Sequence, residues 1–244
     1  MARKGRASAS AIAALALATA AVMLACGLLS MKGSASPSPS GQAVTASSET
    51  ACDALGFPEV DWEYWRSVNP DVIGWITVPG TEVDQPIVQA SSDDPEYYLH
   101  HDVYRKTNVY GVPYLDASCS ATGLLGSPNA VVFGHHMSDG SVFAALSQYS
   151  TSVEFAEEHP VVLLQTPSEK RVLSVRFARI VDGSSSSKRT TFLDDTDRRQ
   201  WYAAELAGAS TVLDADATPP SSLVCLCTCS YNIFDNERTL VYAS

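Results

Sequence analysis

The chain has 244 residues, of which 45% are hydrophobic and 18% are charged, proportions that are ordinary for a globular protein. Its formal net charge is −11, but four of its 16 basic residues lie at or before Lys32, whereas all 27 acidic residues follow it. The remainder has 12 basic and 27 acidic residues, a formal charge of −15, which excludes nucleic acid and acidic polymers as natural partners. A basic or amine-bearing partner suits this surface better, although acidity also serves simple solubility.

The first 32 residues are typical of an export signal. Three basic residues precede an uncharged apolar stretch, residues 11–29, and Lys32 follows it. This stretch has about the minimum length of a membrane-spanning helix. Because basic residues favour the cytoplasmic side, we expect a cytoplasmic tip and a membrane anchor within residues 1–32, with the rest of the chain outside the cell membrane. A cleaved signal peptide and a lipoprotein processed at Cys26 are the alternatives.

The next segment, residues 33–51, is a low-complexity tract rich in Ser, Pro and Gly. It has no apolar periodicity and cannot bury enough surface to fold, so it is predicted to be a tether. Residues 52–244 then remain, which is enough for a single domain with a sizeable core.

The hydrophobic pattern of this domain predicts a mainly β structure. We expect a short helix at 61–68, strands at 72–78 and 83–88, further strands at 109–115, 130–133, 161–165, 171–181, 222–230 and 238–242, and helices at 141–149 and 196–206. Pro86 interrupts the second strand, which is therefore read as an edge strand. Seven or eight short strands with few helices favour an all-β barrel or sandwich over alternating βαβ units.

The six cysteines do not form the pattern of a disulfide scaffold. Cys225, Cys227 and Cys229 alternate along one predicted strand, so they point to one face and cannot easily bond to one another. Only Cys52 and Cys119 remain as a possible pair. The spacing of the three strand cysteines also lacks the loop that separates the ligands of structural zinc sites. We therefore expect no metal site at these cysteines.

Three chemically active side chains stand at predicted strand ends, namely Cys229, His135 and Arg238. A thiolate is a strong nucleophile, an imidazole can act as base and then acid, and a guanidinium can hold the oxyanion formed by attack on a carbonyl. These are the parts of an acyl-transfer site. Sequence spacing does not separate His135 from its neighbour His136, and a strand cysteine is more often a buried apolar residue.

Several motifs resemble, in the right order, those of the sortases, cysteine transpeptidases of Gram-positive cell surfaces, and among them class B. These motifs are NPDVIGWITVPGT at 69–81, DQPIVQ at 84–89, YYL at 97–99, GVPYLD at 111–116, VFGHHM at 132–137 and LCTCSY at 226–231, followed by Arg238. The sequence departs from the family at Cys227, where many relatives have serine, and at Phe133, where tyrosine is frequent.

The resemblance implies a closed eight-stranded β-barrel with N-terminal helices and a helix inserted between strands six and seven, where residues 196–206 lie. It selects His135, which directly follows a glycine, over His136. It also selects Cys229 of the Thr-Cys motif and the following Arg238 as the other two catalytic residues. Neither a cofactor nor a metal is implied.

The function that the resemblance implies is that of a membrane-anchored sortase. Such an enzyme cleaves the C-terminal sorting signal of secreted proteins after Thr through a thioacyl intermediate, here on Cys229. It then transfers the acyl group to an amine of a peptidoglycan precursor or a pilin. The alternatives are a pilin-polymerising sortase, a peptidase, a barrel that binds peptides without turnover, and a thiol redox module that uses Cys227 and Cys229.

Overall fold

The structure is a computed structural model that describes residues 52–184, 188–230 and 236–244. Residues 60–244 form one compact unit, which carries all the helices and strands described below. The predicted membrane anchor (1–32) and tether (33–51) lie outside the described residues. Within the described ranges, no helix is both long enough and apolar enough to cross a bilayer.

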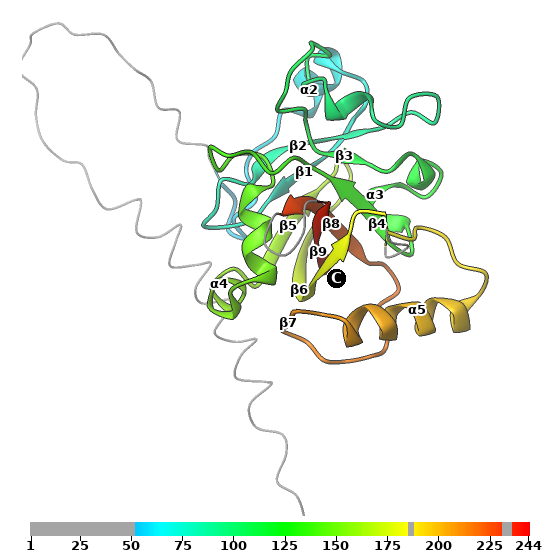
Figure 1. The fold of residues 1–244 in the computed structure, drawn as a ribbon. Helices are drawn as coiled ribbons and strands as arrows, with labels where there is room; N and C mark the ends of the chain where they lie inside the picture. The colour runs from blue at the N-terminus through cyan, green and yellow to red at the C-terminus, as the bar shows by residue number, and fades with distance from the viewer. Residues whose placement is uncertain (1–51, 185–187, 231–235) are drawn as a thin grey trace, which may run out of the picture. The chain divides into compact units, whose positions relative to one another are not determined.

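Nine strands form a single sheet. They are β1 (Val72–Thr77), β2 (Asp84–Gln89), β3 (Tyr114–Leu115), β4 (Ala130–Phe133), β5 (Val161–Gln165), β6 (Lys170–Asp182), β7 (Thr211–Val212), β8 (Val224–Ser230) and β9 (Glu237–Ala243). Their spatial order is β5-β1-β2-β3-β4-β8-β9-β6-β7, and β5 also pairs with β6 (Figure 1). This last pairing closes eight strands into a barrel and leaves β7 attached outside the ring. The prediction of a closed eight-stranded β-barrel is confirmed.

Short helices connect and cover the strands. They are α2 (Trp62–Val68), α3 (Gly123–Gly126), α4 (Val153–Glu158) and α5 (Asp195–Ala207), with 3₁₀ helices η2 (Tyr97–Leu99), η3 (Ala117–Cys119) and η4 (Ala144–Ser150). The side chain of Asp194 caps α5 by accepting a hydrogen bond from the backbone N–H of Asp197. Helix α5 lies between the sixth and seventh barrel strands, β6 and β8, and outside the ring (Figure 1), which confirms the predicted insertion.

Alternation along the strands separates the barrel interior from its outer face. On β8, Val224 and Leu226 belong to the interior cluster, whereas Cys225 and Cys227 belong to an outer cluster that includes Trp201 of α5. A third cluster forms on the outside where α2 and η2 pack against β1, β2 and β3, around a core of seven buried residues: Val72, Val88, Ala90, Tyr98, Val103, Val112 and Tyr114. The two outer clusters share Phe133 at the end of β4 as a packing partner.

Three local predictions were wrong. The strand with Pro86 is not an edge, because β2 pairs with β1 on one side and β3 on the other; pairing with β3 begins only at Val88, beyond the proline. Residues 109–113 are loop, so the strand expected at 109–115 is limited to β3. The helix expected at 141–149 is the 3₁₀ helix η4, and α4 was not anticipated.

Candidate active site

The register of two antiparallel strands sets Cys229 directly opposite Arg238. On β8 and β9 these two residues are Cα partners, one pair before the ladder ends at Ser230 and Glu237. Both side chains are half-buried. The segment that joins the two strands, residues 231–235, lies outside the described residues. The eight intervening positions therefore do not separate the thiol and the guanidinium in space, because the strands fold back on each other.

A parallel pairing brings His135 to the same end of the barrel. Strand β4 runs alongside β8, with Phe133 paired to Cys227, and the Gly134 N–H donates to the Cys227 carbonyl oxygen at 3.1 Å. Two residues beyond this pair, His135 on one chain segment is level with Cys229 on the other. The three predicted residues therefore come from the adjacent ends of β4, β8 and β9.

Gly134 is required by a close approach. A Cβ atom at this position would lie 2.5 Å from the Phe143 ring, so that the ring or the main chain would have to shift. The backbone N–H of Phe143 also donates to the His135 carbonyl oxygen at 2.9 Å. These two contacts hold the main chain on both sides of His135 close to Phe143.

The two neighbouring histidines have different partners. The Nε2 atom of His135 lies 2.8 Å from the carbonyl oxygen of Leu99, the last residue of η2. The Nδ1 atom of His136 lies 2.9 Å from the carbonyl oxygen of Cys229. Because a carbonyl oxygen only accepts, each of these nitrogens carries a proton. His136 thereby fixes the backbone of Cys229, while Nδ1 of His135 stays free of this contact.

The three cysteines of β8 differ sharply in exposure. Cys225 and Cys227 are buried, with 0% and 2% of their surface exposed, whereas Cys229 is half-buried at the end of the strand. Burial raises the pKa of the Cys225 thiol well above its usual range and raises the pKa of Cys227 to about 12. Only Cys229 of the three is accessible to a peptide. Cys119 is a buried free thiol, so the possible pair with Cys52 is not formed.

Two cations lie close to this end of β8. The Arg238 Nη1 atom donates to the carbonyl oxygen of the preceding residue, Glu237, at 2.9 Å, which restrains the guanidinium. The positive charges of Lys188 and Arg238 both act to lower the pKa of Cys227 against the larger effect of burial. Lys188 lies in the loop between β6 and α5, and sequence spacing gave no reason to single it out.

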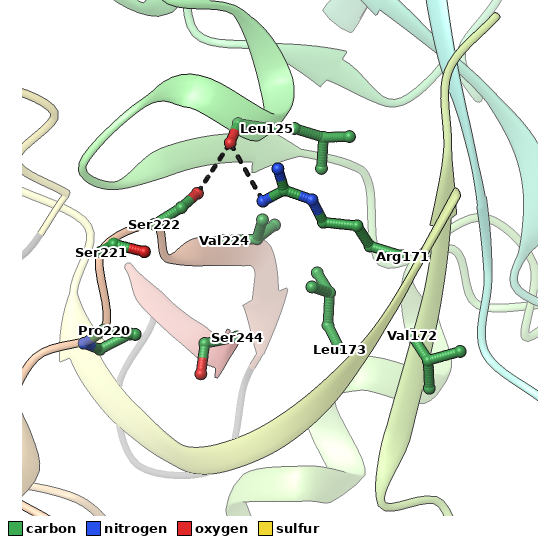
Figure 2. Close-up of a pocket in the computed structure, with 9 residues that line it drawn as sticks. All are labelled: Leu125, Arg171, Val172, Leu173, Pro220, Ser221, Ser222, Val224 and Ser244. Atoms are coloured by element: carbon green, nitrogen blue, oxygen red, sulfur yellow. Dashed lines mark hydrogen bonds between the residues drawn. The ribbon is translucent and has the colours of Figure 1, made fainter. Parts of the chain in front are cut away.

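A hollow on the barrel lies away from the thiol site. It lies at the start of β8, around Val224 and Ser222, at the opposite end of the strand from Cys229. Figure 2 shows the carbonyl oxygen of Leu125 accepting hydrogen bonds there from Ser222 and Arg171. Among the described residues, no group of three or more His, Cys, Asp or Glu side chains could hold a metal ion.

Comparisons with known proteins agree with this geometry. A family model described as "Sortase domain" matches residues 76–244, more than half of the chain. Sortase B of Staphylococcus aureus is 26% identical over 180 residues, which cover 74% of this chain and 72% of that protein. Sortase B of Listeria monocytogenes is 37% identical over 95 residues, which cover 39% of this chain and only 37% of the relative's own length.

The fold comparison gives the same result. The structure of the Staphylococcus aureus sortase B–substrate complex matches with a TM-score of 0.64 and 25% identity, over 74% of this chain and 82% of that one. The extent of the family match decides the assignment. The chain belongs to the sortase family, and the relatives to which it is similar are sortase B proteins, as its motifs predicted.

Proposed function

We propose that the protein is a cysteine transpeptidase that cleaves the C-terminal sorting signal of secreted proteins after Thr. The observation that carries this proposal is the register of the barrel: Cys229 and Arg238 are direct partners on β8 and β9, and His135 follows the end of the neighbouring strand β4 by two residues. A nucleophile, an acid–base group and a fixed cation are what acyl transfer through a thioester requires.

In the first half-reaction, His135 takes the proton of the Cys229 thiol, and the sulfur attacks the threonine carbonyl carbon and forms a C–S bond. The negative charge that develops on the carbonyl oxygen is stabilised by the guanidinium of Arg238, which also holds the peptide backbone. The C–N bond then breaks, and His135 donates a proton to the departing amine. The products are a thioacyl enzyme and the released C-terminal fragment of the signal.

In the second half-reaction, an amine attacks the thioacyl carbon and a new amide bond replaces the C–S bond. His135 takes the proton from this amine and returns it to the departing sulfur, which restores the Cys229 thiol. Water in place of the amine gives hydrolysis. The acceptor that we propose is an amine of a peptidoglycan precursor or a pilin, which is compatible with the acidic surface of the domain.

We further propose that residues 11–29 anchor the chain in the cell membrane and that residues 33–51 hold the catalytic domain just outside it. The apolar stretch, its basic flank and the Ser/Pro-rich tract support this placement. Both substrates of a cell-wall transpeptidase occur at that surface. A thiol redox function is less well supported, because Cys227 is buried and its pKa is raised to about 12.

The test uses the full chain in a mild detergent with a panel of Leu-Pro-x-Thr-Gly-like and Asn-Pro-x-Thr-like peptides. Mass spectrometry of the trapped intermediate should reveal a thioacyl adduct on Cys229, formed with loss of the residues that follow Thr. The Cys229→Ala variant should form none. An adduct on Cys227, or no adduct with any peptide, would overturn the proposal.

A further inference from the structure

The contact between His135 and Leu99 depends on a short turn that is held in place from two sides. Leu99 ends the 3₁₀ helix η2, and its carbonyl oxygen lies 2.8 Å from His135 Nε2. A single 3₁₀ turn has few internal hydrogen bonds and is not rigid by itself. The position of the imidazole therefore depends on whatever fixes η2 to the barrel.

A buried phenol fixes η2 from the inner side. Tyr98, the residue before Leu99, is 2% exposed, and its hydroxyl donates to Asp71 at 2.6 Å and accepts from the Asn69 side-chain amide at 2.9 Å. Burial, together with the hydrogen bond to Asp71, raises the pKa of Tyr98, so the hydroxyl stays protonated and acts as a donor. Arg105 completes the group by donating to both Asn69 and Asp71, at 3.0 and 2.7 Å.

A glycine loop closes on η2 from the other side. Gly111 has a φ of +58°, and a Cβ atom there would lie 2.5 Å from the Tyr98 carbonyl oxygen and 2.9 Å from that of Leu99. The next residue, Val112, donates its N–H to the Tyr98 carbonyl at 3.2 Å. Any side chain at position 111 would push against the same carbonyl that accepts from His135, in a backbone conformation that favours glycine.

We propose that Tyr98 is a positioning residue for His135, acting through the Leu99 carbonyl. The clamped carbonyl holds the proton on Nε2, because it can only accept, and so it leaves Nδ1 as the nitrogen that exchanges a proton with the thiol and the leaving group. This inference rests on the proposed role of His135. It adds the tautomer of the ring, the atom that moves the proton, and the network of Tyr98, Asn69, Asp71 and Arg105 that sets both.

The direct test is the tautomer of His135 in the full chain, labelled with ¹⁵N-histidine and measured by NMR in a mild detergent. The five histidines are assigned with single His→Asn variants. In the unmodified protein, the neutral ring should be the Nε2–H form. A neutral ring protonated on Nδ1 would overturn the proposal without any variant or any activity measurement.

The Tyr98→Phe variant tests the remote network. It keeps the ring and removes the hydroxyl, and we expect a mixed tautomer at His135 and a fall in kcat of about 10-fold, with KM changed by less than about 2-fold, since the ring is misplaced rather than the peptide. Gly111→Ala, which displaces the Leu99 carbonyl from the other side, should reproduce both changes. The peptide used is the one that the unmodified enzyme turns over fastest in the panel.

Tyr149→Phe is the matched control. Tyr149 is equally buried, at 0% exposed, and its hydroxyl donates to the His159 carbonyl oxygen at 2.6 Å rather than to a group of η2. Because the lost hydrogen bond lies outside the network of Tyr98, we expect this variant to lose stability but to keep its kcat and its His135 tautomer. Equal losses of kcat in the two tyrosine variants, or an unchanged tautomer in Tyr98→Phe, would contradict the proposal.

The catalytic role of His135 and the positioning role of Tyr98 can be tested separately. If His135→Asn keeps full turnover, the proposed function is wrong in its choice of acid–base group. If His135→Asn is inactive but Tyr98→Phe and Gly111→Ala are unchanged in kcat and tautomer, only the positioning role of Tyr98 is wrong.

Discussion

The middle and the end of β8 carry the same residue type on the same face of the strand, in opposite settings. In the middle, Cys225 and Cys227 pack under α5 against Trp201 and behave as small apolar side chains. At the end, Cys229 extends past this cover and is half-buried beside Arg238. The three cysteines alternate in the same way along β8, so the exposure of each thiol depends on whether α5 covers it.

The largest expected effect is the loss of the terminal thiol. Cys229→Ala should lower turnover by at least about 10⁴-fold, because no other group can form the thioacyl bond. Cys227→Ser, two residues away, should keep turnover near that of the unmodified enzyme but lower the free energy of unfolding by about 1–3 kcal/mol, since a buried hydroxyl replaces an apolar thiol. Steady-state peptide cleavage and urea unfolding measure both. An inactive but folded Cys227→Ser protein would show that Cys227 is needed for the reaction, and this would contradict the contrast between the two cysteines.

The two neighbouring histidines that follow β4 should differ in their effect on kcat. His135→Asn removes the acid–base group and should lower kcat by about 10³-fold. His136→Asn keeps a donor near the position of Nδ1, which bonds to the Cys229 carbonyl, and should lower kcat by less than about 10-fold. Single-turnover kinetics with the same peptide measure both variants. A reversed order of the two losses would assign the chemistry to His136.

The arginines provide a third contrast. Arg238→Lys keeps the charge opposite Cys229 but loses the forked donor, and we expect kcat/KM to fall by about 10²-fold. Arg179→Lys is the matched control, because Arg179 pairs with Glu205 of α5 at 3.0 Å, in the covered region. It should leave kcat/KM unchanged. Similar values for the two variants would mean that Arg238 supports the fold rather than the reaction.

The smallest effect is on stability at high pH. Burial raises the pKa of Cys227 to about 12 from 9.0, so the folded protein keeps a proton that the unfolded chain has lost. The contribution of this thiol is complete below pH 9.0 and is lost as the pH rises toward 12. Between these values, the unmodified protein should lose up to about 1.4 kcal/mol of unfolding free energy per pH unit more than Cys227→Ala. Urea unfolding at several pH values measures this difference, and parallel curves would place Cys227 in contact with solvent.

Much of the barrel could be predicted because its strands are periodic. The boundaries at 130–133 and 161–165 were correct, and the inserted helix was placed within one residue at each end. The errors fall where pairing or packing overrides the local pattern. Pro86 marks an edge only if no second strand is present, and the sequence does not reveal that β3 pairs beyond it.

The sequence named candidate side chains for the site, but it did not reveal the backbone groups that contact them. Cys229 and Arg238 stand out by residue type, and their opposition follows once β8 and β9 are paired. The Leu99 carbonyl and the Gly111 loop have no side-chain signal, because a main-chain oxygen is present at every position. The covering effect of α5, which separates Cys227 from Cys229, likewise depends on tertiary packing.

The most direct test of the central claim is a crystal structure of the enzyme bearing a peptide trapped on Cys229, with the distances from its sulfur to His135 and Arg238. The account predicts that Nδ1 of His135 and the guanidinium both lie within direct contact or one bridging water of the sulfur or the peptide carbonyl oxygen, about 3–6 Å. Either group turned away from the adduct, beyond the reach of one water, would contradict it.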